Sequence, residues 1–357
     1  MAYIEMHRGK LRHNFVFLDS LLTRNNITWA VVTKMLCGNK PFIQEVISLG
    51  FRQVCDSRVS NLKAVKQLDP SVETIYIKPP AQKALKGVVQ YADISFNTDF
   101  ETIQLLSEEA KRQNKLHKII IMLELGELRE GVMRDEFVDF YEKVFKLPAI
   151  SVVGIGANLN CLNGILPNED KLIQLSLYKQ LIEARFNRKL PFVSGGSSVT
   201  IPMLIENRVP IGVNHFRIGE ALFFAKDLFT LGKIEGMETD VFKVYAQIIE
   251  LYEKPMVPDG EQSVNVSGDK PLMNKEDIGK TSFRAIIDLG LLDVDANHIH
   301  SYDKDIILAG ASSDMMVLDL GENPGNYKVG DMMPLKPDYM GVLKIMNSFY
   351  IEKRIVD

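Results

Sequence analysis

The chain has 357 residues, 46% of them hydrophobic, which is enough apolar material for one large core or two moderate ones. Its formal net charge of -4, without any basic block or stripe, argues against a nucleic acid as partner. The three cysteines are far apart and odd in number, so they predict neither a disulfide framework nor a zinc site and fit a reducing cytoplasm. The sequence shows no run of about eighteen apolar residues, and we expect no membrane span.

The first part of the chain alternates helix-like and strand-like segments. Leucine and phenylalanine at spacings of three and four predict an amphipathic helix at residues 7–23, and the apolar run TWAVVTKM predicts a buried strand at residues 28–35. A helix follows at residues 41–49, with Gly50 just past its end. Further strand signals recur at residues 53–56, 74–77, 93–97, 118–123, 151–158, 192–195 and 215–218. Helical patterns separate these strands, at residues 58–68, 81–90, 99–114, 134–146, 168–188, 198–206 and 220–229.

Eight strand-then-helix units in about 200 residues are typical of a (β/α)8 TIM barrel, and an open doubly wound sheet is the alternative. No glycine-rich dinucleotide turn follows the first strand, which favours the barrel. After Leu231 the sequence changes to short strand-like runs separated by the turn clusters PDGEQ, SGDKP and GENPGN, which indicates a mostly β domain. We therefore predict a barrel at residues 1–231 and a β domain at residues 232–357, with residues 1–6 as a candidate strand for pairing with it.

Lys34 lies near the end of the first predicted strand, where a buried strand has no packing use for an ammonium. The lysine either extends to solvent or is a reactive amine at the mouth of a barrel. In a barrel the catalytic residues lie at the carboxyl ends of the strands, and in this sequence several of these ends carry polar residues. The polar positions are Lys34, Asp56, Ser57, Arg58, Arg129, Asn158, Asn160, residues 194–198 (SGGSS) and residues 217–220 (RIGE).

The loops after the seventh and eighth strands commonly bind phosphate in this fold. Here SGGSS and RIGE each lead into a predicted helix and offer backbone N–H groups at its positive end. Each segment alone is more often a plain turn, and their convergence with Lys34 is what indicates a phosphorylated ligand. A lysine, a phosphate cradle and an arginine together suggest pyridoxal phosphate.

Several segments resemble one family in the order of the barrel strands. VVTKM, LREGV, GANLN, SGGSS and FRIGEALF are similar to the alanine-racemase-like (fold-type III) group of pyridoxal phosphate-dependent enzymes. DSRVSNL, RIGEALFF and GASSD resemble its ornithine and amino-acid racemase branch. The resemblance covers nearly the whole chain. It implies a pyridoxal phosphate-dependent racemase, an isomerase that interconverts L- and D-amino acids by removing the α-proton.

The resemblance also implies roles for individual residues. Lys34 would bond to the cofactor and act as one of two catalytic bases. Arg129, in the segment ELGELREGV, would lie near the substrate carboxylate. Arg58, judged from its place after the second strand alone, either forms an ion pair with Asp56 or contacts the same carboxylate. Asn158 stands where alanine racemases carry a histidine. The implied cofactor contacts are Lys34, Asn158, Ser197, Ser198, Arg217, Gly219, Glu220 and Tyr350.

Arg217 bears on the type of reaction. In the resembling racemases an arginine faces the pyridine nitrogen of the cofactor, whereas related decarboxylases use a carboxylate there. Because a guanidinium cannot accept a proton, the nitrogen stays unprotonated and the ring is a weaker electron sink. Arg217 therefore favours a racemase over a decarboxylase. An ion pair between Arg217 and Glu220 on a solvated rim is the alternative interpretation.

Racemisation needs a proton carrier on each face of the substrate. Alanine racemases supply the second carrier as a tyrosine from the β domain of the partner subunit, but this chain has GLLD in what looks like the same place, and leucine cannot move a proton. Asp293, Ser313 and Asp314 are the candidates that remain. The two histidines of NHIH predict an exposed loop rather than a metal site.

The same resemblance implies a homodimer whose active site is shared between subunits, and a small amino acid as substrate. Ornithine or lysine would want an acidic partner for the distal ammonium, such as Glu124, Glu127 or Asp314. The alternative functions are a related decarboxylase or lyase, a non-catalytic pyridoxal phosphate-binding protein, and a phosphosugar enzyme without a cofactor.

Overall fold

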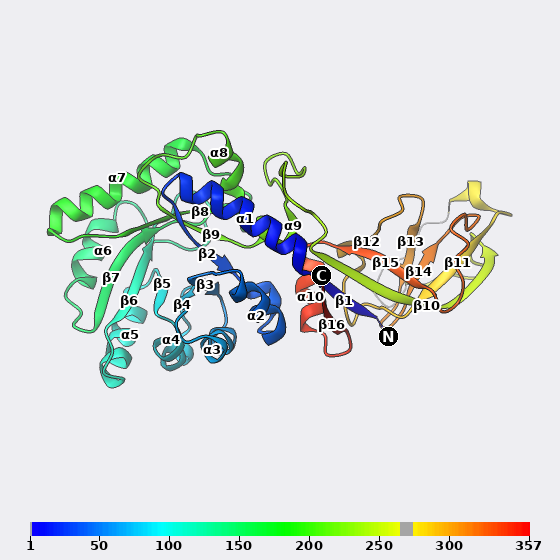
Figure 1. Ribbon diagram of the computed structural model, residues 1–357, viewed down its shortest axis with the longest axis horizontal. Helices are drawn as coiled ribbons and strands as arrows, with labels where there is room; N and C mark the ends of the chain where they lie inside the picture. Colours follow the sequence, from blue (N-terminus) through cyan, green and yellow to red (C-terminus); the bar gives the residue numbers. More distant parts are fainter. Residues whose placement is uncertain (1, 265–273) are drawn as a thin grey trace. The chain divides into compact units, whose positions relative to one another are not determined.

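A computed structural model describes residues 2–264 and 274–357, so the predicted SGDKP turn at residues 267–271 lies outside the described residues. The chain divides into two compact units (Figure 1). The first is Gly9–Thr239, and the second combines Met1–Arg8 with Asp240–Asp357. The main part of the second unit thus begins at Asp240 rather than at residue 232.

The unit Gly9–Thr239 is a closed barrel of parallel strands surrounded by helices, which confirms the predicted (β/α)8 fold (Figure 1). Its strands are β2 (Thr28–Val32), β3 (Gln53–Asp56), β4 (Glu73–Tyr76), β5 (Ile94–Asn97), β6 (His117–Met122), β7 (Ile150–Gly156), β8 (Phe192–Ser197) and β9 (His215–Ile218). Its helices are α1 (Arg8–Arg24), α2 (Lys40–Ser48), α3 (Val59–Leu68), η2 (Gln82–Ala84), α4 (Leu85–Tyr91), α5 (Phe100–Arg112), α6 (Phe137–Val144), α7 (Glu169–Phe186), η3 (Ser198–Thr200), α8 (Ile201–Ile205) and α9 (Glu220–Phe224). β2 and β9 close the barrel, with Ala30 opposite Arg217.

Alternate side chains of the strands pack into an apolar core inside the barrel. This core contains Ala30, Cys55, Ile75, Ile94, Phe96, Ile120 and Met122. Burying a side chain such as isoleucine contributes about 1.5–3 kcal/mol. Outside the barrel, Asn39, Asp99 and Asn168 cap α2, α5 and α7 by accepting a backbone N–H of the first turn. Core and caps fix the strands, so the polar residues at their carboxyl ends have defined places.

The second unit is an antiparallel sheet in the order β12-β15-β10-β11-β14-β13, as predicted for a mostly β domain. Its strands are β10 (Phe242–Pro255), β11 (Thr281–Ile287), β12 (Ile299–Ser301), β13 (Ile307–Ala311), β14 (Met316–Asp319), β15 (Met332–Pro337) and β16 (Glu352–Val356), with α10 (Tyr339–Asn347) and the turns η4 (Lys275–Asp277) and η5 (Ala296–His298). The N-terminal β1 (Tyr3–His7) pairs antiparallel with β10 and parallel with β16.

Among the predicted elements that are shorter than expected, two bear on the site. The strand at residues 28–35 ends at Val32, because Thr33 leaves the extended conformation and Lys34 begins the short helix η1 (Lys34–Leu36). The helix at residues 220–229 ends at Phe224, because Ala225 adopts a left-handed conformation with φ of 50°. Lys34 therefore lies on the turn that follows a strand, not within the strand.

Some elements of the second unit were not predicted at all. These are α10, β12, β15 and β16. The NHIH segment is not an exposed loop, since it forms η5 and the start of β12. Nδ1 of His298 lies 2.8 Å from the Asp338 carboxylate, which explains why this histidine is held in place.

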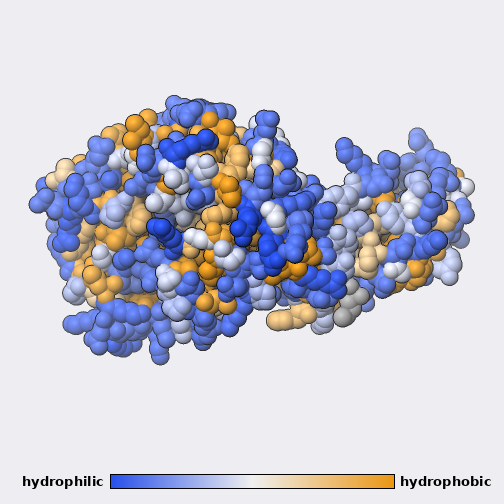
Figure 2. All heavy atoms as spheres, in the orientation of Figure 1, coloured by the Kyte–Doolittle hydropathy of each residue, from blue (hydrophilic) through white to orange (hydrophobic). Residues whose placement is uncertain are grey.

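The surface in the view of Figure 2 is mostly hydrophilic, with hydrophobic atoms in separate patches rather than in one continuous band. Among the described residues, no helix combines the length and apolar character that crossing a membrane requires.

Candidate active site

Lys34 is placed by a hydrogen-bond network at the end of β3. The backbone N–H of Thr33 donates to the carbonyl of Cys55 at 2.9 Å, and the Thr33 hydroxyl donates to Asp56 at 3.0 Å. After Lys34 the chain turns at Gly38, whose φ of 77° favours glycine and where a Cβ would lie 2.8 Å from the Asn61 side chain. The half-buried Lys34 is thus fixed at the carboxyl end of the barrel.

Asp56 is fully buried at the end of β3 and serves this network. It accepts hydrogen bonds from the Arg58 backbone N–H at 2.9 Å and from the Asn61 amide at 3.1 Å, besides that of Thr33. Burial raises the pKa of Asp56, and these hydrogen bonds act in the opposite direction. The side chain of Arg58 is exposed, so Asp56 and Arg58 interact through the backbone and not as an ion pair.

Arg217 lies inside the barrel on β9 and is only 6% exposed. Nη1 donates to the Ser194 carbonyl at 2.7 Å and to Ser194 Oγ at 2.6 Å, and Nη2 donates to the Ala157 carbonyl at 2.8 Å. The guanidinium also stacks over the Phe96 ring, 5.2 Å from its centroid. Burial lowers the pKa of Arg217, although an arginine keeps its proton in a protein. These contacts to β7 and β8 hold the guanidinium, so the rim pair with Glu220 is not its anchor.

A line of polar side chains continues from Arg217 through the barrel interior. Ser194 Oγ lies 2.7 Å from Nδ1 of His215, and Nε2 of His215 lies 3.2 Å from Oε1 of Gln53. Gln53 donates to Glu73 at 2.7 Å, and Lys118 donates to the other oxygen of Glu73 at 3.1 Å. Burial lowers the pKa of His215 to about 3, so the ring is neutral. Because Gln53 Oε1 can only accept, Nε2 carries the proton and Nδ1 accepts from Ser194.

The SGGSS and RIGE segments meet at the ends of β8 and β9. Ser198 is buried, and its hydroxyl accepts the backbone N–H groups of Gly219 at 3.3 Å and of Ala221 at 3.0 Å. Ser197 forms a capping box with Thr200 at the start of η3. Ser198 therefore takes up the Gly219 N–H and keeps its own hydroxyl proton as a donor. Glu220 is the first residue of α9.

Asn158 follows β7, and its buried Nδ2 has no hydrogen-bond partner within the described residues. A buried donor without a partner costs about 1–3 kcal/mol, so this atom calls for a ligand. The loop that follows Asn158 wraps around the carboxylate of Glu127, which accepts the backbone N–H groups of residues 160, 161, 162, 163 and 165 at 2.5–3.1 Å. Burial opposes the charge of Glu127, but these donors outweigh it and hold its pKa below the usual value.

Arg129 and Glu130 form an ion pair with two contacts, Nε to Oε2 and Nη2 to Oε1 at 2.6 Å. This pair raises the pKa of Arg129. Arg129, Glu130 and Cys161 also lie close enough to Arg217 to affect its pKa. The structure thus gathers Arg129, the loop after β7 and Arg217 at the same end of the barrel.

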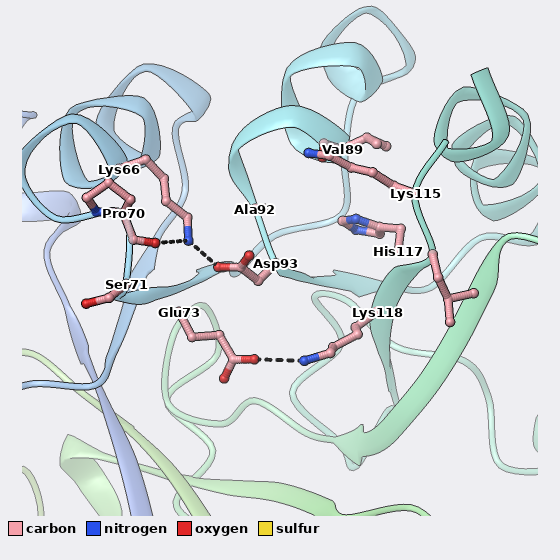
Figure 3. A pocket seen from close by; sticks show the side chains of 11 residues that line it. Lys66, Pro70, Ser71, Glu73, Val89, Ala92, Asp93, Lys115, His117 and Lys118 are labelled. Carbon is pink, nitrogen blue, oxygen red and sulfur yellow. Dashed lines mark hydrogen bonds and ion pairs between the residues drawn. The ribbon is translucent and has the colours of Figure 1, made fainter. Parts of the chain in front are cut away.

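A pocket of about 400 Å³ lies elsewhere, at the amino ends of the strands (Figure 3). Its cations are bonded to the protein: Lys66 to Asp93 at 2.7 Å, Lys118 to Glu73 at 3.1 Å and Lys115 to the carbonyl of Val89 at 2.9 Å. None of the predicted site residues lines it. These lysines therefore stabilise the closed end of the barrel.

Comparison with known proteins gives matches that cover most of the chain. The family model for the alanine racemase N-terminal domain matches residues 6–227. An ornithine racemase from Acetoanaerobium sticklandii is 35% identical over 349 residues, 98% of this chain and 98% of that protein. A lysine racemase from Thermotoga maritima is 30% identical over 333 residues, 93% of this chain and 92% of that protein.

The chain belongs to the alanine racemase family. With racemases as its relatives over nearly the full length, it is an amino-acid racemase, which is an isomerase. The racemase also shares its fold with a solved alanine racemase from Bartonella henselae, described with covalently bound pyridoxal phosphate, at a TM-score of 0.73 and 15% identity over 99% of both chains.

The other predicted site residues of the racemase, Asp293, Ser313, Asp314 and Tyr350, lie in the unit that contains residues 240–357. Hydrogen bonds fix the segments that carry them. The backbone N–H groups of Leu291 and Leu292 donate to the carbonyls of residues 312 and 313 at 3.0 and 2.8 Å. The Ser313 hydroxyl donates to Asp314 at 3.0 Å, and both residues are exposed.

Two further candidates of that unit are joined through Ser348. Its hydroxyl donates to the buried Asp293 at 2.5 Å and accepts the backbone N–H of Tyr350 at 3.2 Å. Tyr350 itself is 76% exposed. Asp293 therefore has a structural partner, whereas the phenol of Tyr350 and the carboxylate of Asp314 face solvent.

Sequence reasoning assigned no role to Ser194 as a partner of Arg217, and none to Glu130. Inward and outward side chains alternate along β8 and β9, and Ser194 and Arg217 both occupy inward positions. This alternation could have indicated that the two side chains meet. Glu130 carried only the signal that it is adjacent to Arg129. For Glu127 the expectation was wrong, because its carboxylate is occupied by backbone N–H groups and has no place for a substrate ammonium.

Proposed function

We propose that this racemase uses pyridoxal phosphate and acts on a dibasic amino acid such as ornithine or lysine. The observation that carries the proposal is Arg217, a buried guanidinium fixed by Ser194 and Ala157 on the strand that pairs with β2, the strand leading to Lys34. A carboxylate at this position would favour a decarboxylase, and the arginine favours return of a proton to the substrate.

The residues of the barrel fit a phosphorylated pyridine. Nδ2 of Asn158 is a buried donor that finds no acceptor among the residues described by the structure. The hydroxyl protons of Ser197 and Ser198, with the backbone N–H of Glu220, would donate to the phosphate, and Gly219 would contribute by placing that segment. Arg217 would face the ring nitrogen. Tyr350 would add a contact through its exposed phenol.

When bound, the cofactor supplies an aldehyde that captures the substrate amine and a ring that delocalises the electrons left by the α-proton. Lys34 holds the cofactor and moves the α-proton on one face of the substrate. Arg129 binds the substrate carboxylate, since a guanidinium matches a carboxylate through two parallel hydrogen bonds. Arg58 is exposed and would contribute to the same carboxylate at longer range.

The second proton carrier would be Asp314 together with Ser313, from the β unit of a neighbouring copy. Two observations support this choice over Asp293. Asp314 is exposed, whereas Asp293 is buried and already accepts a hydrogen bond from Ser348. A shared site requires a homodimer, in which each copy completes the site of the other. A cytoplasmic location is supported by Cys37, Cys55 and Cys161, which form no disulfide in the described part of the chain.

Two measurements test the proposal. The purified protein should be yellow, borohydride should bleach it and attach the cofactor to the peptide that contains Lys34, and Lys34→Ala should abolish this labelling. In deuterium oxide, NMR should show loss of the α-proton of L-ornithine or L-lysine while the optical rotation decays. A colourless protein would exclude the cofactor, and release of carbon dioxide would assign the chain to the decarboxylases instead.

A further inference from the structure

Three carboxylates at the carboxyl end of the barrel are bonded to donors of the protein itself. Asp56 accepts three hydrogen bonds, from Thr33, Asn61 and the backbone of Arg58. Glu124 accepts the backbone N–H of Gly126. Glu127 accepts five backbone N–H groups. Asp56 and Glu127 cannot leave these donors without loss of loop structure, and the buried Glu124 is anchored at one oxygen, so all three have a structural role.

Glu130 differs from these three because its partner is a side chain that has its own role toward the substrate. It bonds to the guanidinium of Arg129 through both oxygens. The Glu130 side chain is 12% exposed and that of Arg129 is 37% exposed, so the carboxylate is the more buried member. Both residues influence the pKa of Arg217, which places the pair near the site.

The backbone on both sides of the pair is fixed in an unusual conformation. Leu128 has a φ of 54°, which is rare for a leucine, and Gly131 has a φ of 149°. A Cβ at Gly131 would collide with the backbone N of Glu124, and the adjacent Val132 bridges to Leu123 at the end of β6. Such conformations persist where the surrounding structure enforces them, and they cluster at ligand sites. The pair is therefore presented on a rigid segment.

We propose that Glu130 recognises the distal ammonium of a dibasic amino acid, which displaces Arg129 from it. This inference rests on the proposed function and names the residue behind its substrate class. In the protein without substrate, Arg129 and Glu130 neutralise each other. A dibasic substrate brings a carboxylate for Arg129 and an ammonium for Glu130, so one ion pair is broken and two are formed.

The exchange explains discrimination as well as binding. A dibasic substrate opens the Arg129–Glu130 pair without leaving a charge unpaired, because its ammonium takes the place of the guanidinium at Glu130. A neutral amino acid also opens the pair through its carboxylate, but it leaves Glu130 without a partner at a largely buried position. An unpaired buried charge is a strong penalty, and specificity often depends on such a penalty against the wrong ligand. Glu130 therefore favours lysine over norleucine, which has the same chain without the ammonium.

The experiment compares lysine with norleucine in the holoenzyme and in three variants. Glu130→Gln removes the charge, Glu130→Asp keeps it on a shorter side chain, and Glu136→Gln is the matched control, an exposed acid of the same loop. The kcat and KM values come from α-proton exchange in deuterium oxide. Calorimetry with α-methyllysine and α-methylnorleucine, which have no α-proton, gives Kd without turnover.

Glu130→Gln should raise the KM of lysine and the Kd of α-methyllysine about 10- to 100-fold, the size expected for one charge-assisted hydrogen bond. The values for norleucine and α-methylnorleucine should stay the same or fall. Glu130→Asp should recover part of the loss for the dibasic ligands, and Glu136→Gln should match the wild type.

The opposite results would overturn the proposal. Equal losses for lysine and norleucine would mean that Glu130 only positions Arg129, and no loss for either would remove it from the site. In both cases the wild type would still exchange lysine, so the proposed function would stand. A wild type that exchanges norleucine or alanine but neither lysine nor ornithine would contradict the substrate class itself, and the role of Glu130 with it.

Discussion

Arg217 and His215 lie two residues apart on β9 and face the same barrel interior, yet burial acts on them differently. Burial lowers the pKa of both, but arginine starts from so high a value that it stays charged, whereas His215 becomes neutral. The neutral ring can then accept from Ser194 and donate to Gln53. The charge of Arg217 is thereby supported by a neighbour that does not repel it.

His215 should make the stability of the barrel depend on pH. Its pKa is about 3 in the folded chain against 6.5 in the unfolded chain, so the unfolded state binds more protons between these values and stability falls as pH decreases. From pH 7 to pH 5 the loss should be about 2 kcal/mol. Urea unfolding of the wild type and of His215→Gln, each at pH 7 and pH 5, measures this loss of stability.

His117 is a second buried histidine with which His215 can be compared. Burial lowers the pKa of His117 to about 4, and its Nε2 is hydrogen-bonded to Ser95 Oγ at 2.8 Å. His117→Gln should reduce the same pH dependence by a similar amount. A His215→Gln variant with the full wild-type pH dependence would show that His215 is not the neutral group described above.

At the scale of elements, the strands could be predicted because their signals are local. β3 and β9 have the predicted bounds, since each is a short segment that is followed closely by the start of a helix. The turn at Thr33 could not be predicted, because it depends on hydrogen bonds to Cys55 and Asp56 from another strand. The same holds for the site: Lys34 and Arg217 follow from motifs, but the partners of Glu127 and Glu130 follow from loops that meet only in the fold.

Glu127 connects two loops, the one that carries Arg129 and the one that follows Asn158. Glu127→Gln keeps the shape of the side chain, but the amide nitrogen is a donor and would face backbone N–H groups that need an acceptor. Hydrogen exchange should show faster exchange for the amides of residues 160–165. Misplacement of site residues by about 1 Å can cost about 100-fold in rate. We therefore expect kcat/KM to fall by about 10- to 100-fold.

Glu124→Gln is the control for this change, since Glu124 is equally buried in the same loop but accepts only the N–H of Gly126 among the described residues. Its effect on the amides of residues 160–165 should be small. Unchanged hydrogen exchange in Glu127→Gln would contradict the connection between the two loops.

At the scale of the whole molecule, the candidate proton carriers belong to different units. Lys34 lies in Gly9–Thr239 and Asp314 in the unit that contains Asp240–Asp357. If the site is completed by a neighbouring copy, Lys34→Ala and Asp314→Asn should each be inactive alone. Mixed subunits should regain about a quarter of the wild-type activity, because half of random dimers are hybrids and each hybrid holds one intact site.

Sedimentation should show a dimer for each variant, so that lost activity is not lost assembly. Mixtures that stay inactive although hybrids form would place both proton carriers in one chain, and a monomeric wild type would contradict a shared site altogether.

The polar line from Arg217 to Lys118 has a consequence for protein engineering. In barrel enzymes the amino ends of the strands are usually treated as a region for stability, separate from the chemistry at the other end. Here Gln53 and Glu73, at those amino ends, orient His215 so that the Ser194 hydroxyl donates to it while the Ser194 oxygen accepts from Arg217. A stabilising redesign of the barrel floor that replaced Gln53 would remove the acceptor that keeps the proton of His215 on Nε2, so floor and active site have to be redesigned together.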